Sequence, residues 1–243
     1  MIYFISDLHL APQAPGASRI FLDFLGGRAR AAEQLFILGD LFDAWPGDDC
    51  LDDPNDSFAT LIVDALHELV RAGVSLSVLH GNRDFLLGSA FAARSGARLR
   101  PDPCVLSVPT WQFVLSHGDA LCTDDHDYQE FRSLVRQPQW QSDFLAKPLR
   151  ERQATIAALR QQSESAKRDK ASFVMDVNAA ATDDFLRANA YATLIHGHTH
   201  RPARHEHLVD GIHVERWVLS DWHEQRGECL CWDGESLRRE CLP

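Results

Sequence analysis

The chain has 243 residues, a length that suits one large domain or a core with an insertion. Hydrophobic residues make up 45% of it and charged residues 24%, which is close to the globular average and excludes general disorder. The formal net charge of -11 argues against electrostatic binding of nucleic acid, because an acidic surface repels a phosphate backbone.

The sequence also predicts a compartment. No apolar run approaches the roughly 20 residues that span a bilayer, and Ile2–Ile5 predicts a core strand where a signal peptide would lie. The six cysteines lack the spacing of a disulfide scaffold, so we interpret them as cytosolic thiols. The unusual feature is the 12 histidines beside 35 acidic residues, because both kinds of side chain bind metal ions.

Short apolar runs rich in Val, Ile, Leu and Phe predict strands that are buried on both faces. They are residues 2–5, 35–38, 74–79, 113–115 and 193–195. Between the early runs, Ser57–Arg71 carries apolar residues at helical spacing, with Gly73 just beyond its end. Phe85–Arg94 is a second candidate helix. The alternation of strand and helix predicts an α/β layered fold.

Residues 124–190 lack strand runs and form a different region. We expect helices at 127–136, 148–166 and 178–189, and interpret the region as a helical insertion over the core. The acidic stretch 43–56 is interpreted as a solvated loop.

The last part of the chain, residues 203–241, contains alternating segments and the turn signal Asp233-Gly234. This pattern predicts a second, largely antiparallel sheet. Cys229 and Cys231 would share one face of a strand there, and we favour packing over a zinc site because partner ligands are lacking.

Each of the five apolar runs is followed by side chains that bind metal ions. These side chains are Asp7, His9, Asp40, Asn82, His117, His198 and His200. Open α/β sheets build their sites beyond the carboxyl ends of the strands. Residues two apart in a strand project the same way, so Asp7 and His9 should converge, as should His198 and His200. We interpret the other histidines near strands as ordinary polar residues: His80, His196, His205, His207 and His213.

Five motifs occur in a fixed order along the chain. They are Asp-x-His (7–9), Gly-Asp-x-x-Asp (39–43), Gly-Asn-Arg-Asp (81–84), His-Gly (117–118) and Gly-His-Thr-His (197–200). Together they resemble those of the calcineurin-like metallophosphoesterases. The resemblance implies an α/β fold, a four-layer αββα sandwich of the metallophosphoesterase type with a helical cap insertion.

The resemblance also implies two divalent metals. The first would be held by Asp7, His9, Asp40 and His200, and the second by Asp40, Asn82, His117 and His198, with Asp40 bridging. Such mixed oxygen and nitrogen ligands suit Mn, Fe or Zn better than Mg. The expected reaction is phosphoester or phosphoanhydride hydrolysis by a metal-activated water, with Asp40, Asn82, Arg83 and His117 as the catalytic residues. Arg83 replaces the usual histidine of the motif and offers a fixed positive group to phosphate.

Longer segments are similar to one subfamily, the UDP-2,3-diacylglucosamine diphosphatases of bacterial lipid A synthesis. They are residues 37–45, 80–88, 117–125, 175–178 and 196–202, and the similarity extends from residue 1 to about 222. The subfamily implies attack of water on the α-phosphorus of UDP-2,3-diacylglucosamine, giving UMP and 2,3-diacylglucosamine 1-phosphate. It further implies two Mn²⁺ per chain, other divalent metals being possible, and a peripheral location on the cytoplasmic face of the inner membrane.

By the same resemblance, residues 1–123 and 191–243 form the phosphoesterase core and 124–190 the cap for the lipid substrate. The residues implied to bind the substrate are Asn82, Arg83, Asp125, Ser163, Lys167, Lys170 and His198, with Tyr128 as a weaker candidate. We expect no obligate protein partner.

Independently of the resemblance, residues 126–175 hold nine Lys and Arg against six Asp and Glu, a local charge of +3. A basic amphipathic cap suits an anionic lipid substrate and the anionic surface of the inner membrane. Its apolar residues could line an acyl-chain groove or simply pack the cap onto the core: Trp140, Phe144, Leu145, Leu149, Ile156 and Leu159. Lys167 and Lys170 could likewise bind substrate or form a solvated helix face.

Two alternatives stay open at this point. One is a metallophosphoesterase for a water-soluble substrate such as a nucleotide. The other is a non-catalytic scaffold on the same fold, which we disfavour because all seven expected ligands are present.

Overall fold

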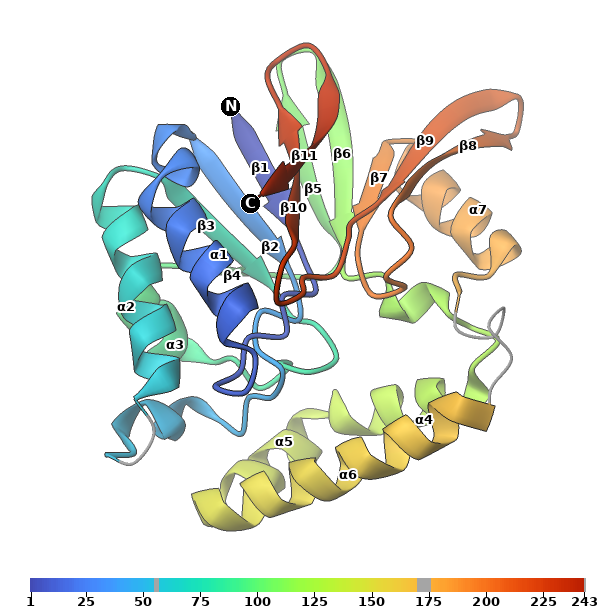
Figure 1. Cartoon of the computed structure of the whole chain (residues 1–243). Helices are drawn as coiled ribbons and strands as arrows, with labels where there is room; N and C mark the ends of the chain where they lie inside the picture. Colours follow the sequence, from blue (N-terminus) through green and yellow to red (C-terminus); the bar gives the residue numbers. More distant parts are fainter. Residues whose placement is uncertain (55–56, 170–175, 243) are drawn as a thin grey trace.

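The computed structural model describes residues 1–54, 57–169 and 176–242. Two β-sheets face each other, with helices on their outer faces and a separate group of helices across one end (Figure 1). The first sheet has the order β11-β10-β1-β2-β3-β4 and the second the order β5-β6-β7-β9-β8.

The first sheet contains β1 (Ile2–Ile5), β2 (Gln34–Leu38), β3 (Ser75–Leu79), β4 (Arg98–Arg100), β10 (Gly227–Trp232) and β11 (Leu237–Leu242). The second contains β5 (Cys104–Val108), β6 (Trp111–Ser116), β7 (Thr193–His196), β8 (Ala203–Val209) and β9 (Ile212–Val218). The helices are α1 (Pro15–Gly26), α2 (Phe58–Arg71), α3 (Ser89–Ser95), α4 (His126–Val135), α5 (Pro138–Leu145), α6 (Leu149–Asp169) and α7 (Ala179–Ala188).

Three apolar clusters hold these layers together. Phe4, Phe113 and Trp232 belong to the cluster between the two sheets. A larger cluster packs α1 and α2 against the outer face of the first sheet, and a third packs Leu186 of α7 against the second. The predicted four-layer αββα sandwich is therefore confirmed.

The end of the chain differs from the prediction of one antiparallel sheet over residues 203–241. The β8–β9 hairpin joins the second sheet, where β9 lies parallel to β7, and the β10–β11 hairpin joins the first, antiparallel to β1. Each hairpin is a local pairing, but long-range packing decides which sheet it extends. The prediction for Cys229 and Cys231 is confirmed, because both side chains pack in the cluster under the helices.

The second candidate helix is shorter than predicted. Residues 85–88 are not helical, and α3 begins at Ser89. The carboxylate of Asp48 accepts hydrogen bonds from the backbone N–H groups of Gly88, Ala90 and Phe91, at 2.8–3.0 Å. A distant acidic side chain thus satisfies the free N–H groups at the start of α3, which the local sequence does not reveal.

The interpretation of residues 43–56 as a solvated loop is wrong for its described part. Besides the contacts of Asp48, Asp43 pairs with Arg160 and Asp49 pairs with Arg152, both on α6. The loop therefore attaches the helices above it to the core.

The helices across the end of the sandwich are α4, α5 and α6, and we call them the cap. α5 was not predicted, and Pro138 begins it, because proline suits the first turn of a helix. α7 was expected in the same insertion but lies against the second sheet. No helix among the described residues has both the length and the apolar composition to cross a bilayer.

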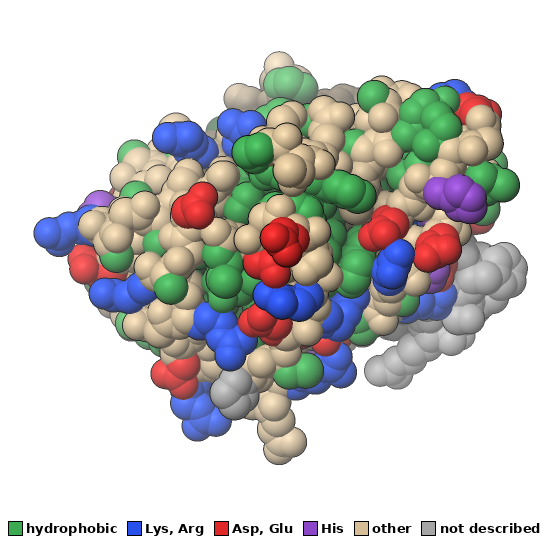
Figure 2. Space-filling view, turned by 90° about the horizontal axis from the view of Figure 1, so that it is seen from above, with side chains coloured by type: hydrophobic (Ala, Val, Ile, Leu, Met, Phe, Trp, Pro, Cys, Tyr) green, Lys and Arg blue, Asp and Glu red, His purple; other side chains and the backbone are tan. Residues whose placement is uncertain are grey.

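The opposite end of the sandwich, seen in Figure 2, mixes apolar side chains with acidic and basic ones. Exposed Trp111, Leu208 and Ile212 lie beside the β5–β6 and β8–β9 turns. The candidate metal ligands all follow strands at the other end, under the cap.

Arg152 should make a measurable contribution to attachment of the cap. It is 1% exposed and donates to the carbonyl oxygens of Lys147 and Pro46 as well as to Asp49. We expect Arg152→Met to cost about 2 kcal/mol, because the carbonyl of buried Pro46 and two partly buried acceptors lose their donor, and to lower Tm by about 4–8 °C. Thermal unfolding followed by circular dichroism measures this, with exposed Arg150→Met as the control. Equal Tm values for the two variants would contradict the prediction.

Candidate metal centre and active site

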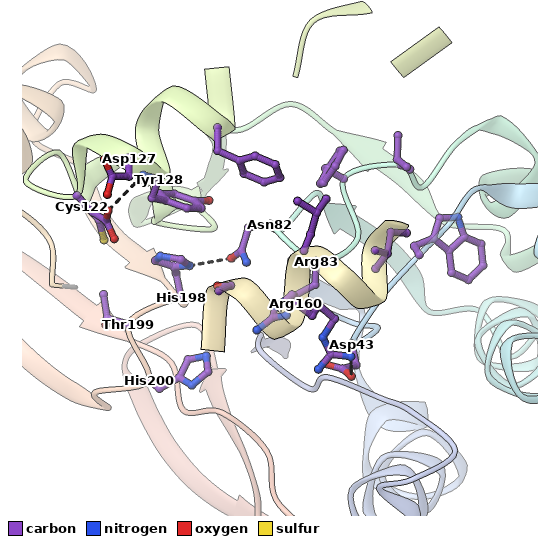
Figure 3. Close-up of a pocket in the computed structure, with 18 of the residues that line it drawn as sticks. Asp43, Asn82, Arg83, Cys122, Asp127, Tyr128, Arg160, His198, Thr199 and His200 are labelled. Carbon is purple, nitrogen blue, oxygen red and sulfur yellow. Dashed lines mark hydrogen bonds and ion pairs between the residues drawn. The ribbon is translucent and has the colours of Figure 1, made fainter. Parts of the chain in front are cut away.

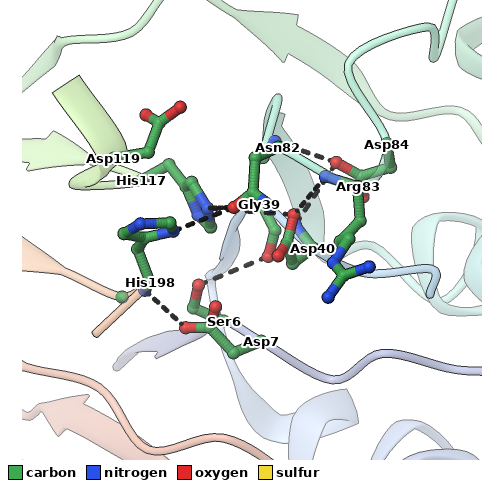
Figure 4. A network of polar contacts seen from close by, with 12 residues as sticks. Ser6, Asp7, Gly39, Asp40, Asn82, Arg83, Asp84, His117, Asp119 and His198 are labelled. Carbon is green, nitrogen blue, oxygen red and sulfur yellow. Dashed lines mark hydrogen bonds and ion pairs between the residues drawn. The ribbon is translucent and has the colours of Figure 1, made fainter. Parts of the chain in front are cut away.

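The seven candidate ligands converge at the carboxyl ends of five strands, as predicted. They come from the segments after β1, β2 and β3, which are neighbours in the first sheet, and after β6 and β7, which are neighbours in the second. Figure 4 shows Asp7, Asp40, Asn82, His117 and His198 of this set. Strand geometry is not the reason for the convergence, however. β1 ends at Ile5 and β7 at His196, so both predicted ligand pairs lie in loops.

Unusual backbone conformations bring the loop side chains together. Eight non-glycine residues of the described chain have positive φ, and five of them are candidate ligands: Asp7, His9, Asp40, His198 and His200, with φ between 47° and 67°. Each such conformation costs roughly 1–3 kcal/mol and persists only where the surroundings enforce it. The strain is therefore concentrated at this centre, as is usual for a functional site.

One cluster joins Asp7, His9 and His200. The two histidine Nε2 atoms are 3.3 Å apart, and the Nε2 of His200 is 3.4 Å from Oδ1 of Asp7. This carboxylate oxygen is fully buried and has no hydrogen-bond partner within the described part of the chain. A buried, unpaired carboxylate oxygen facing two imidazoles is the environment that a divalent cation fits.

A second cluster joins Asn82, His117 and His198. Oδ1 of Asn82 is 2.9 Å from Nε2 of His117 and 2.9 Å from Nδ1 of His198. The Nδ1–H of His117 donates to the carbonyl oxygen of Leu38 at 2.9 Å, so in the neutral ring the lone pair is on Nε2, toward the cluster. An amide oxygen and two ring nitrogens thus converge on one point, a donor set that also fits a divalent cation.

Asp40 lies between the two clusters. Its Oδ2 is 3.8 Å from Nδ1 of His9, and its Oδ1 is 3.8 Å from Nε2 of His117. The opposed oxygens give Asp40 the geometry of a bridging ligand. Gly81 allows this approach, because a Cβ there would collide with Oδ1 of Asp40.

The electrostatics of these groups show how closely they are coupled. Burial, with the charges of Asp84 and Asp7, raises the pKa of Asp40 to about 7. Burial opposes the proton on His117, but the charges of Asp40 and Asp7 outweigh it and raise that pKa to about 9. Burial lowers the pKa of His9 to about 3. Close carboxylates thus account for the raised pKa values of Asp40 and His117, and a bound metal ion would replace the protons that these groups retain.

Three carboxylates outside the predicted set support the ligands. Asp84 accepts from the backbone N–H groups of Asp40 and Leu41, at 3.3 and 2.8 Å, and holds the loop after β2. Asp221 lies 3.2 Å from Nδ1 of His200 and directs the other ring nitrogen of this histidine toward Asp7. Asp119 is the third. Only Asp84 and Asp119 had a sequence signal, since each lies in or next to one of the recognised motifs.

Asp119 connects the centre to the cap. It is fully buried and accepts from the hydroxyl of Tyr128 at 2.6 Å and from Nε of Arg132 at 2.8 Å, both on α4. The Tyr128 ring stacks on His198, with 5.7 Å between ring centroids. α4 therefore holds one of the candidate ligands in place.

A pocket of about 600 Å³ opens from the centre toward the cap (Figure 3). Its polar end contains Asn82, Arg83, His198 and His200. Its other end is apolar and is lined by residues of the cap and of the segment before α3: Phe85, Leu86, Phe131, Trp140, Phe144, Ile156 and Leu159. The two ends of the pocket therefore match the polar and the apolar part of an amphiphilic ligand.

The structure places most of the predicted substrate residues on this pocket. Asn82, Arg83, Asp125, Ser163 and His198 line it, as does Tyr128. Lys170 and the side chain of Lys167 lie outside the described residues. Asp43 and Arg160 also line the pocket and were not among the predicted substrate residues.

The apolar cap residues divide between lining the pocket and packing elsewhere. Trp140, Phe144, Ile156 and Leu159 line the pocket, whereas Leu149 only packs against the core cluster and Leu145 is exposed. Three of the pocket residues also pack against that cluster, so lining and packing are not exclusive.

The support from Asp221 can be tested through metal affinity. We expect Asp221→Ala to weaken metal binding 10–100-fold, since His200 loses the acceptor that fixes its orientation. Asp221→Asn, which can still accept the hydrogen bond, should fall between this variant and the wild type. Titration of the metal-free protein with Mn²⁺ measures the affinities, with exposed Asp143→Ala as the control. Wild-type affinity in Asp221→Ala would refute this role.

The fold and the two ligand clusters are those of a metal-dependent phosphoesterase. The model of the calcineurin-like phosphoesterase family matches residues 1–202. The chain is 54% identical to the UDP-2,3-diacylglucosamine hydrolase of Aromatoleum aromaticum over 95% of its own length and 92% of that protein. It is 48% identical to that of Chromobacterium violaceum, over 98% and 97% of the two chains, and 44% identical to that of Bordetella pertussis, over 98% and 93%. The chain therefore belongs to the calcineurin-like phosphoesterases and, among them, to the family of the UDP-2,3-diacylglucosamine hydrolases.

Proposed function

We propose that the protein hydrolyses the pyrophosphate of UDP-2,3-diacylglucosamine, by attack of water on the α-phosphorus, to UMP and 2,3-diacylglucosamine 1-phosphate. One observation supports this most strongly: a single pocket runs from the two ligand clusters into an apolar chamber under the cap. A water-soluble nucleotide has no long apolar chain that would fill such a chamber. A lipid with a diphosphate head group has both parts.

The proposed ligands are Asp7, His9, Asp40 and His200 for one metal, and Asp40, Asn82, His117 and His198 for the other. This division is supported by the separation of the two clusters and by the two oxygens of Asp40 between them. Divalent cations bound there would make a water molecule more acidic and offset the negative charge that grows on the phosphoryl oxygens.

The other pocket residues would bind and orient the substrate. The Arg83 guanidinium offers positive charge to the diphosphate next to Asn82, while its backbone N–H holds Oδ1 of Asp40 at 2.8 Å. Asp125 and Ser163, with Lys167 and Lys170, are proposed to contact the head group. The apolar chamber would take the acyl chains and exclude water around them.

We propose Mn²⁺ as the native metal. Carboxylate, amide and imidazole ligands without thiolate support this choice over Mg²⁺, but they suit other transition metals as well. A comparison of Mn²⁺, Co²⁺, Zn²⁺ and Mg²⁺ added to metal-free protein should give the highest kcat with Mn²⁺. A higher rate with one of the others would change the assignment.

We further propose the division into a core of residues 1–123 and 191–243 and an insertion of residues 124–190, of which α4–α6 cover the site. We also propose that the cap side meets the cytoplasmic face of the inner membrane. Exposed Phe131, Leu134 and Leu145 of the cap support this proposal, as do exposed Lys147 and Arg150, which follow Leu145 in the sequence. Flotation with vesicles rich in anionic lipid should recover more protein than flotation with neutral vesicles. Equal recovery would count against the membrane proposal.

The reaction itself is tested by release of UMP. Purified protein with Mn²⁺ should release UMP from the lipid substrate, and an excess of chelator should abolish the release. Rapid turnover of water-soluble phosphodiesters, with no turnover of the lipid, would instead favour a phosphoesterase for soluble substrates.

A further inference from the structure

A chain of hydrogen-bonded polar side chains runs through the second sheet behind the metal centre, from buried His196 to Asp183 on α7. On β9, the guanidinium of Arg216 lies 3.0 Å from Nε2 of His196 on β7 and 3.1 Å from Nε2 of His207 on β8. Nδ1 of His207 lies 3.0 Å from a carboxylate oxygen of Asp183 on α7. Arg216 and His196 are 7% and 0% exposed, so neither contacts the pocket or bulk solvent to any extent.

Arg216 determines which ring nitrogens carry protons. A guanidinium has only donors, so the Nε2 atoms of His196 and His207 must both accept. The proton of a neutral His196 is therefore on Nδ1, which donates to the carbonyl oxygen of Gly197 at 2.9 Å. By the same argument, Nδ1–H of His207 donates to Asp183. One arginine thus fixes the tautomers of two histidines.

The His196 ring also touches two of the three loops that carry the ligands of the second cluster, those of His117 and His198. A Cβ at Gly118, next to His117, would lie 2.6 Å from Nδ1 of His196, so the ring packs directly on that backbone. On the other loop, the Gly197 carbonyl accepts from His196 and from the N–H of Thr199, at 2.8 Å. His198 lies between Gly197 and Thr199, and its φ is 67°. The hydrogen bonds of its two neighbours hold the backbone in this strained conformation.

We propose that His196 and Arg216 are positioning residues for the metal centre: Arg216 holds the His196 ring in one tautomer and orientation, and the ring holds the loops of His117 and His198 at their binding distance. This inference rests on the proposed role of these two histidines as metal ligands. His196 and Arg216 contact neither ligand atoms nor substrate. They act by limiting the relaxation of strained backbone, and their loss should appear first in metal affinity.

Two pairs of variants separate positioning from simple stability. Arg216→Met keeps much of the volume and removes both hydrogen bonds, while Arg216→Lys can donate to one imidazole but not span both. His196→Gln can accept from Arg216 and donate to Gly197, while His196→Leu can do neither. Arg204→Met is the matched control, since Arg204 is an exposed residue of neighbouring β8 that pairs with Glu206 and Glu215.

The measurements are titration of metal-free protein with Mn²⁺, the metal stoichiometry, and long-range ¹H–¹⁵N spectra of the histidine rings. We expect Arg216→Met and His196→Leu to bind one of two Mn²⁺ ions, the one held by the second cluster, 10–100-fold less tightly. Arg216→Lys should lose less, and His196→Gln and Arg204→Met should match the wild type. The signal pattern of a His196 ring protonated at Nδ1 should be lost in Arg216→Met. The same pattern should persist in Arg216→Lys and Arg204→Met. With the lipid substrate, kcat should fall and KM should stay constant.

Unchanged Mn²⁺ affinity in folded Arg216→Met and His196→Leu would overturn the inference, whatever their Tm, and would leave the proposed function intact. If Arg216→Met does not fold, the inference is tested with Arg216→Lys, His196→Gln and His196→Leu. Equal Mn²⁺ affinity of His196→Gln and His196→Leu would then refute the positioning role. A wild-type chain that binds no Mn²⁺ would overturn the ligand assignment itself and this inference with it.

Discussion

Replacement of the Asp40 carboxylate by an amide, Asp40→Asn, should abolish binding of both metals and lower kcat by at least about 10³-fold. The reason is the position of Asp40 between the two clusters, 3.8 Å from His9 on one side and 3.8 Å from His117 on the other. A bound cation supplies several kcal/mol of charge stabilisation, and each 1.36 kcal/mol corresponds to a factor of ten in rate. Metal analysis of the purified variant and UMP release from the lipid substrate measure the two effects.

The same variant should be at least as stable as the wild type when both are free of metal. Burial raises the pKa of Asp40 to about 7, whereas an exposed aspartate titrates near 4. The native state therefore holds a proton that the unfolded chain releases, so this group costs stability as pH rises from about 4 to about 7. The neutral amide of the variant avoids that cost. Without metal, the Tm of Asp40→Asn should be higher than that of the wild type at pH 8. This difference in Tm should become smaller as the pH is lowered toward 4.

Added Mn²⁺ should reverse the order, because only the wild type gains stability from binding. The control is Asp23→Asn, an exposed residue of α1 that should change none of these quantities. Wild-type metal content in Asp40→Asn would refute the bridging role. A metal-free variant that is less stable than the wild type at pH 8 would refute the electrostatic argument.

The second large effect concerns the apolar chamber. Leu159 of α6 lines the pocket beside Ile156 and Phe144, and Leu159→Trp would fill space that an acyl chain needs. Each buried methylene contributes about 0.8 kcal/mol, so the displacement of about four should lower kcat/KM for the lipid roughly 100-fold. Turnover of a small water-soluble phosphodiester at the same metal centre should not change. Steady-state kinetics with the two substrates measure the contrast.

Gln153→Trp provides the matched control, because Gln153 is exposed on the same helix and lies outside the pocket lining. Equal loss of both activities in Leu159→Trp would mean that the cap or the metal centre had been disturbed. An unchanged rate on the lipid would mean that the acyl chains lie elsewhere, and the chamber would then need another occupant.

Most of the core was predictable from short patterns. Ile2–Ile5 and the other buried apolar runs became strands, because nothing but a doubly covered strand suits such a run beside helical segments. The αββα arrangement itself came from the resemblance of five motifs rather than from periodicity. The separation of the last two hairpins between the sheets was not predictable, since local pairing is the same in either sheet.

The ligands were predictable for a different reason. A polar residue shortly after a buried strand lies near the carboxyl end of that strand. The positions of Asp40 and Asn82 at this end of the sheet could therefore be predicted without a structure. The supporting residues could not. Asp221 and Arg216 act through contacts with residues far away in the sequence, and His196 looked like an ordinary polar side chain at a strand end.

By itself, then, the sequence determined the buried strands, the types of ligand side chain and their position after the carboxyl ends of these strands. These features depend on local hydrophobicity and on spacing along the chain. The tertiary structure alone decided how the ligands converge and what surrounds them. Left-handed backbone at Asp7 and His198, the ion pairs of the acidic loop with α6, and the chamber under the cap depend on packing between distant segments. No local pattern encodes that packing, since its energy comes from groups that meet only in the folded chain.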